Sequence, residues 1–355
     1  MGPEDTRVMT RPAVRLPAHR LGIDEVVDRI AAEHAARPAL TEAALQAGLA
    51  MVRNTQVASR AWLDPPEQVL DSSAPRRDLM RTARALADLA VEAAAAAISD
   101  AAVEPERIGT LIVTSSTGYL MPGADVQIVN RLGLSPRVRR IPAAQLGCAG
   151  AAWALARGLE QARLDPQSAV LVVGAEAFSL AVRPDIWRRD AMVWRGLAGD
   201  GAAASVLLPP RPDLGGLHIY GDPFEYLLRD SAAYYYEELS YDGFDFHTSG
   251  AATRAVAQVM GDVRAWLGDW PTDMVLAHTG GPRILLATAQ GLGLPDEKPL
   301  RWSWASLRAA GNLASAGVPH AITGLYSDPP PPGTRGVIIS YGPGFTVAAV
   351  RCAWT

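Results

Sequence analysis

The sequence is poor in cysteine, in charge of one sign and in long apolar segments. Its 355 residues include only two cysteines, Cys148 and Cys352, which excludes a disulfide scaffold and favours a reducing compartment, the cytoplasm. The net charge is −4 and no basic stripe is present, so we expect no nucleic-acid partner. No apolar run reaches the roughly 18 residues of a membrane span, and the polar segment Met1–Arg11 does not resemble a secretory signal. We therefore expect neither a membrane partner nor export.

Two further patterns are missing. The sequence has no cluster of ligand residues with metal-site spacing, and no Gly-x-Gly-x-x-Gly motif follows a predicted strand. The sequence therefore predicts no metal and no redox cofactor.

Apolar residues make up 49% and charged residues 20% of the chain, as in an ordinary globular protein. Helical and strand-like periodicities alternate along it, which predicts an α/β fold of two similar halves, residues 1–208 and 209–355, each with helices covering a largely parallel sheet. The predicted helices are Ile23–His34, Thr41–Met51, Asp78–Asp100, Ala124–Leu132, Ala149–Arg163, Ala251–Leu267, Pro282–Gly291 and Leu313–Leu325. The predicted strands are Thr110–Thr114, Ala169–Val173, Ala202–Leu208, Asp273–Ala277, Gly336–Ser340 and Phe345–Arg351. The least regular part is the acidic, tyrosine-rich segment Tyr234–Phe246, which we expect to line a pocket.

Cys148 lies in the segment QLGCAG, between a strand-like run and a run of small residues that opens a helix. A cysteine at the N-terminal end of a helix meets partial positive charge, which predicts a lowered thiol pKa. Small neighbours leave room for an acyl chain. The alternative, a buried structural cysteine, suits Cys352 near the end of a terminal strand better.

His278 ends a predicted strand and is followed by Thr279, Gly280, Gly281 and Pro282. The two glycines remove side-chain bulk beside the ring, and the proline can begin a helix. A structural, hydrogen-bonded histidine is the alternative. The other five histidines lack this setting, so we give them no catalytic role.

Asn312 lies in the segment GNLASAG and could simply cap the next helix. Chemistry suggests another role. An enzyme that makes a carbon–carbon bond from a cysteine thioester needs two donors for the thioester oxygen while a carbanion develops. A neutral imidazole and a carboxamide supply them.

These segments together resemble the chalcone-synthase-like, or type III, polyketide synthases of the thiolase superfamily, over most of the chain. The family's motifs are matched by QLGCAG around Cys148, by HTGGPRIL from His278 and by GNLASA around Asn312. Further matches are TGYLMPGAD (residues 117–125), GDGA (residues 199–202) and YGPGF (residues 341–345).

The resemblance implies a five-layered αβαβα thiolase-like fold and a homodimer in which Met121 reaches the partner's cavity. It implies acyl loading on Cys148, with His278 and Asn312 promoting decarboxylation and holding the enolate. It also implies a set of pocket residues, for which ordinary core packing is the alternative. These are Ser116, Thr117, Phe178, Ala181, Phe224, Gly243, Ala314, Gly342, Pro343 and Gly344.

One segment departs from the family. Plant members carry a cluster of Lys and Arg that binds the phosphates of coenzyme A, whereas RNTQVASR (Arg53–Arg60) keeps Arg53 and places Val57, Ala58 and Ser59 where the basic run should be. Because phosphate recognition depends on charge-assisted bonds, this loss weakens the case for free coenzyme A as the carrier. A similar subgroup takes chains from acyl carrier proteins and joins two of them into an α-pyrone.

The predicted function is therefore a ketosynthase, an acyltransferase that loads an acyl thioester on Cys148. It then condenses the acyl group with a malonyl or β-ketoacyl thioester and cyclises the product. Iterative use of malonyl-coenzyme A and joining of two carrier-bound chains both stay open. The enzymatic alternative is an initiating ketoacyl-carrier-protein synthase III or a related acyltransferase, against which the GGP segment argues. The non-enzymatic alternative is the inactive subunit of a ketosynthase heterodimer, against which the intact Cys148 argues.

Overall fold

A ten-stranded mixed sheet runs through the whole chain in the computed structural model, which describes residues 6–355 except 76, 212 and 241–242. Met1–Asp5, the start of the segment analysed above for export, therefore lie outside the described residues. The strand order is β12 (Met274–Ala277), β13 (Arg335–Gly342), β14 (Thr346–Trp354), β9 (Leu217–Leu227), β1 (Thr6–Met9), β8 (Asp200–Leu208), β7 (Ala169–Ala177), β5 (Ile108–Thr114) and β6 (Arg139–Ala143), and β2 (Ala13–Arg15) pairs with β8. Two separate two-stranded sheets are formed by β3 (His19–Gly22) with β4 (Ser59–Trp62), and by the hairpin of β10 (Tyr235–Ser240) and β11 (Gly243–Thr248).

The strand directions repeat between the two halves. In the first half β5 and β7 are parallel and β7 and β8 antiparallel; in the second, β12 and β13 are parallel and β13 and β14 antiparallel. The expectation of a largely parallel sheet is wrong, because β13 and β14 are joined by residues 343–345 alone, a connection that allows only antiparallel pairing. Strand β1 pairs with both β8 and β9, so the halves share one sheet and the boundary at residue 208 stays a prediction.

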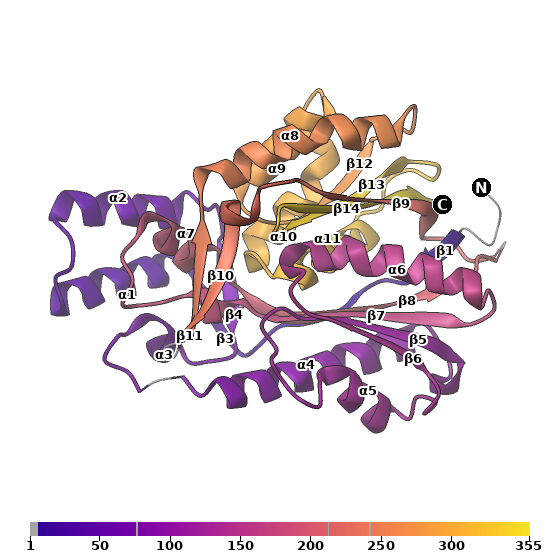
Figure 1. Cartoon of the computed structure of the whole chain (residues 1–355), viewed down its shortest axis with the longest axis horizontal. Helices are drawn as coiled ribbons and strands as arrows, with labels where there is room; N and C mark the ends of the chain where they lie inside the picture. Colours follow the sequence, from indigo (N-terminus) through magenta and orange to yellow (C-terminus); the bar gives the residue numbers. More distant parts are fainter. Residues whose placement is uncertain (1–5, 76, 212, 241–242) are drawn as a thin grey trace.

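The fold has five layers (Figure 1). Helices form three of them, and the two parts of the large sheet form the layers between the helices. One outer layer contains α4 and α5, the central layer α6 and α11, and the other outer layer α8 and α9. The bounds are α1 (Ile23–Ala36), α2 (Glu42–Arg53), α3 (Pro66–Leu70), α4 (Leu79–Asp100), α5 (Ala124–Leu132), α6 (Gly150–Leu164), α7 (Arg189–Leu197), α8 (Gly250–Leu267), α9 (Pro282–Leu292), α10 (Arg301–Ala310) and α11 (Gly317–Ser327). This arrangement confirms the predicted five-layered α/β class.

Local signals explain why most predicted elements are confirmed. Helix α4 begins where the Asp78 carboxylate accepts hydrogen bonds from the amides of Met80 and Arg81, and α5 ends at Gly133, whose φ of 70° is left-handed. The helix predicted over Leu313–Leu325 instead starts at Gly317, after a short 3-10 turn, η7 (Ala314–Ala316). The elements not predicted from the sequence are α3, α7, α10, β1, β2, β3, β4, β9, β10 and β11.

The central layer explains the small residues of α6. Its alanines pack against strands of both halves, and at Gly158 an added Cβ would lie 2.5 Å from Leu207. Close packing on two sides therefore requires small side chains along this helix. Because α6 is held from both sides, its N-terminal end, which follows Cys148, has a fixed position between the two halves. None of the helices within the described ranges combines the length and apolar character needed to cross a membrane.

Candidate active site

Cys148 lies at the junction of the two halves. It belongs to the 3-10 turn η3 (Gly147–Ala149), which follows β6 and leads into α6, so the predicted strand–turn–helix setting is confirmed. Gly147 has a φ of 51°, and a Cβ there would lie 2.8 Å from the ring of Pro343. Only glycine allows the backbone at residue 147 to lie so close to Pro343. This close contact fixes the Cys148 turn against the turn between β13 and β14.

The thiol of Cys148 is 2% exposed, and this burial decides its protonation. Burial, and after it the carboxyl of Glu176, raises the pKa of Cys148 to about 12, although hydrogen bonds with Tyr235 and Asn312 act in the opposite direction. The predicted lowering of this pKa is therefore wrong for the unloaded enzyme, because the cost of burying a charged sulfur exceeds the stabilisation from the helix end. The sulfur becomes nucleophilic only when its proton has an acceptor.

His278 directly follows β12, and its backbone amide donates to the carbonyl of Ile339 at 2.9 Å. Burial lowers the pKa of His278 to about 3, so the imidazole is neutral at physiological pH. Its Nδ1 is buried and has no hydrogen-bond partner among the described residues. A neutral ring with a free nitrogen can accept a proton or donate one to an oxygen.

Glycine beside the histidine has the predicted effect. A Cβ on Gly280 would lie 2.7 Å from Nε2 of His278, and Gly281 has a φ of 117°, which an L side chain rarely adopts. Both positions therefore require glycine, one for the ring and one for the backbone.

Asn312 is held by its own backbone and by its neighbours. Its amide donates to Leu197 at 2.7 Å, and its carbonyl accepts from Gly199 at 3.1 Å. Its Oδ1 accepts from the amide of Ala314 at 2.9 Å, so the side chain does cap the turn η7. The capping bond also orients the amide, placing Nδ2 4.0 Å and Oδ1 3.9 Å from Sγ of Cys148.

Cys148, His278 and Asn312 line one cavity of about 580 Å³. A volume in this range fits a small-molecule substrate. Its walls come from both halves of the chain. Helix α7 belongs to the first half, and the β10–β11 hairpin, α9 and β13 belong to the second. Among the predicted pocket residues, Gly342 also lines it.

The other predicted pocket residues all lie outside this lining. Ser116 and Thr117 bind the buried carboxylate of Glu176 through their hydroxyls and backbone amides, at 2.7–3.2 Å. Met121 is 99% exposed on a loop. The remaining ones outside the cavity lining are Phe178, Ala181, Phe224, Gly243, Ala314, Pro343 and Gly344. Phe178 packs edge-on against Trp194, which does line the cavity. The pocket roles of these residues stay predictions.

Four aromatic residues of the lining were not predicted as individual site residues: Tyr341 and Phe345, which flank the predicted residues 342–344, and Tyr235 and Trp194. Tyr235 belongs to the irregular tyrosine-rich segment, whose predicted place at a pocket is confirmed, although residues 241–242 of that segment lie outside the described ranges. Trp194 lies on α7, a helix that the sequence analysis did not predict. Only the pairing of distant elements brings the rings of Tyr235 and Trp194 to the cavity of Cys148, so no local pattern could have identified them.

Exposed arginines lie in and beside the cavity lining. Arg189 at the start of α7 and Arg283 on α9 line it, and both are exposed with no carboxylate partner among the residues described. The predicted phosphate ligand Arg53 is exposed on the last turn of α2, between the lining residues Met51 and Asn54. Exposed arginines of two further elements therefore lie at the cavity, in addition to Arg53 beside it. Within the described part of the chain, no group of three potential metal ligands occurs.

The chain matches the family model described as chalcone and stilbene synthases, N-terminal domain, over residues 64–209. It is 30% identical to a phloroglucinol synthase of Pseudomonas fluorescens, over 97% of this chain and 98% of that protein. It is 29% identical to a 1,3,6,8-tetrahydroxynaphthalene synthase of Streptomyces griseus, over 98% and 92%. Among solved structures, the 1,3,6,8-tetrahydroxynaphthalene synthase of Streptomyces coelicolor superposes with a TM-score of 0.90 at 27% identity, over 98% and 99%. The germicidin synthase of the same organism gives 0.87 at 25% identity, over 99% and 100%.

The chain therefore belongs to the type III polyketide synthases, the family of the chalcone and stilbene synthases. It is an acyltransferase of that class, a ketosynthase that forms carbon–carbon bonds by Claisen condensation and cyclises the product. These relatives favour this class over an initiating ketoacyl-carrier-protein synthase.

Proposed function

We propose that Cys148 accepts the acyl group, and that His278 and Asn312 hold the thioester oxygens. The observation that carries this proposal is their common cavity, in which the Asn312 amide lies 4.0 Å from the sulfur and the imidazole is neutral. His278 takes the thiol proton as Sγ attacks the carbonyl of an acyl thioester. The carbonyl then reforms, and the carrier thiol leaves with that proton.

The second half-reaction uses the same donors. A malonyl thioester loses carbon dioxide, and the negative charge that develops on its thioester oxygen is stabilised by N–H groups of the imidazole and the carboxamide. The enolate carbon attacks the acyl carbon on Cys148, which expels the thiolate and forms a β-ketoacyl thioester. A β-ketoacyl thioester can take the place of the malonyl unit by transferring an α-proton to the basic nitrogen of the neutral His278 imidazole instead of losing carbon dioxide. No step requires a metal or a redox cofactor.

For the product, we propose lactonisation of the joined chain to an α-pyrone. The substrates are thioesters on the phosphopantetheine arm of an acyl carrier protein. Arg189, Arg283 and Arg53 come from three separate helices. Positive charges distributed in this way complement the extended acidic surface of a carrier protein better than they complement one compact phosphate group.

We expect carrier-protein thioesters to have kcat/KM values about tenfold above those of the matching coenzyme A thioesters. Steered association between oppositely charged surfaces raises the rate of encounter, and the advantage should shrink as salt is added. Arg189→Ala and Arg283→Ala should reduce it, whereas Arg84→Ala, an exposed position on α4 outside the cavity lining, should not. A higher kcat/KM for the coenzyme A form would rule out the carrier-protein assignment.

Gly280→Ala should reduce kcat about 10- to 100-fold, because the new methyl group displaces the His278 ring and small misplacements of a catalytic group are costly. The measurement is product formation together with thermal unfolding, which should change little. Gly261→Ala on α8 is the control, since a Cβ there meets nothing within 4 Å. Equal activity in both variants would contradict the role given to His278.

We also propose that the enzyme is a homodimer. Met121 is an apolar side chain that is 99% exposed, the largest exposed fraction among the large apolar residues of the described chain. Burial against a partner subunit would remove this surface from water.

A further inference from the structure

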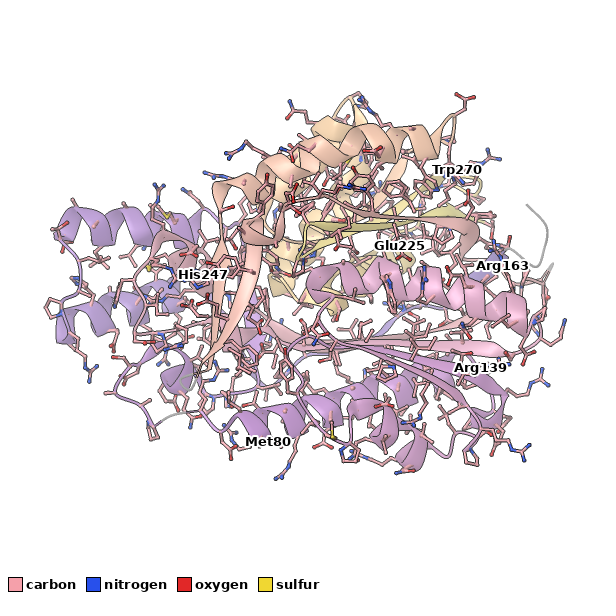
Figure 2. All side chains as sticks on the ribbon, viewed as in Figure 1. Met80, Arg139, Arg163, Glu225, His247 and Trp270 are labelled. Carbon is pink, nitrogen blue, oxygen red and sulfur yellow. The ribbon has the colours of Figure 1, made fainter. Side chains whose placement is uncertain are left out.

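Tyr235 begins β10, and its side chain faces the cavity, opposite to that of its neighbour. Strand residues alternate between the two faces of a hairpin. Tyr236 accordingly stacks on His247 of β11, with ring centroids 4.6 Å apart, and is 37% exposed. His247 marks this hairpin in Figure 2. The two tyrosines thus have the same chemistry on the same strand but different surroundings.

The hydroxyl of Tyr235 lies 3.9 Å from Sγ of Cys148, about as close as the amide of Asn312. The ring is held by tilted contacts with Phe246 and Trp194, at centroid distances of 5.3 and 5.9 Å. Such packing leaves the hydroxyl little freedom to move away from the sulfur.

The sulfur is the sole hydrogen-bond partner of this hydroxyl within the described residues. A buried phenol normally bonds to a good acceptor, and a neutral thiol is a poor one. A thiolate, by contrast, is a charged acceptor and forms a much stronger hydrogen bond. The hydroxyl is therefore placed for the ionised state of Cys148.

The charges around the sulfur are consistent with this reading. Glu176 and Tyr235 are the titratable groups that shift the pKa of the thiol. The other titratable side chains that line the cavity are His278, Tyr341, Arg189, Asp190 and Arg283. The buried carboxyl of Glu176 raises the pKa of the thiol, and the hydrogen bond from Tyr235 lowers it. Burial raises the pKa of Tyr235 well above its usual value, so the phenol stays a donor at every working pH.

We propose that Tyr235 is a fourth polar residue of the site, beside Cys148, His278 and Asn312. Its hydroxyl donates a hydrogen bond to the Cys148 thiolate and thereby speeds acyl transfer to the sulfur. The proposal rests on the nucleophilic role proposed for Cys148. In the transfer, the proton of the thiol goes to His278, the Tyr235 proton stays on its oxygen, and the hydrogen bond to sulfur is given up as the thioester forms.

The test is the pH dependence of Cys148 alkylation by iodoacetamide, followed by peptide mass spectrometry, in Tyr235→Phe. We expect alkylation at pH 7.5 to slow about tenfold, the loss for one charge-assisted hydrogen bond, and the pH profile to move to higher pH. Acyl loading should slow by a similar factor. Tyr236→Phe, the control on the same strand, should match the parent protein in both measurements.

A second variant separates the hydroxyl from the ring. Tyr235→Leu should show the same displacement of the pH profile as Tyr235→Phe. If Tyr235→Phe matches the parent and only Tyr235→Leu differs, the residue acts by packing and the proposal is overturned. Alkylation needs no thioester, so a parent protein that alkylates at Cys148 but never loads an acyl group would refute the proposed function and leave this test valid.

Discussion

Replacing Cys148 by alanine should abolish acyl loading and reduce product formation by at least about 10³-fold. Among the described residues no other thiol lines the cavity beside His278 and Asn312, and removal of a nucleophile leaves only the catalysis that binding and oxyanion stabilisation provide. Intact-protein mass spectrometry after incubation with an acyl thioester would show the adduct in the parent chain and no adduct in Cys148→Ala.

The second cysteine supplies the matched control. Cys352 is also fully buried, on β14, and burial raises the pKa of its thiol as well, but it does not line the cavity. Cys352→Ala should therefore keep the adduct on Cys148. An acyl adduct of unchanged yield in Cys148→Ala would refute the assignment of the nucleophile.

The positions of the three residues proposed for catalysis could be predicted because their signals are local. Cys148, His278 and Asn312 each lie in a turn of small residues between an apolar strand or helix and the next element, and the structure has those turns. The reason for the glycines is visible only in three dimensions, where the backbone of Gly147 approaches Pro343, which is far along the sequence. The local sequence pattern thus predicts where the three residues lie, and tertiary packing explains why glycines stand beside them.

The cavity walls could not be predicted in the same way. Tyr235 and Trp194 line the cavity of Cys148 from two elements that are distant from it in sequence, and the arginines that line it come from α7 and α9. The sign of the Cys148 pKa shift was also misjudged from sequence, since the helix end can be predicted but the depth of burial cannot. Properties that depend on the register of distant elements stay hidden in a single sequence.

Glu176 illustrates the same limit. Its carboxyl accepts hydrogen bonds from Ser116, Thr117 and Ser315, and burial raises its pKa. The sequence analysis selected two of these partners but not the carboxylate, because an acidic residue inside an apolar strand has no motif of its own. Glu176 lies on β7, and its carboxyl raises the pKa of the Cys148 thiol through an electrostatic interaction.

His278→Ala should reduce malonyl decarboxylation and condensation by about 10²- to 10³-fold, the usual cost of removing one donor from a developing oxyanion. Because burial lowers the pKa of His278 to about 3, the ring is neutral throughout the range from pH 6 to 8. Titration of His278 should therefore cause no step in kcat there, in contrast to an exposed histidine with a pKa near 6.5. The measurement is carbon dioxide release from a malonyl thioester against pH.

The control for this substitution is a second neutral histidine, which is partly buried. Burial lowers the pKa of His320 to about 4, and its ring bonds to Ser306 at 2.8 Å, outside the cavity lining. His320→Ala should lower the unfolding temperature and leave carbon dioxide release per folded molecule unchanged. Full decarboxylation by His278→Ala would instead mean that Asn312 alone carries the developing charge, and the imidazole would then serve only to take the proton from Cys148.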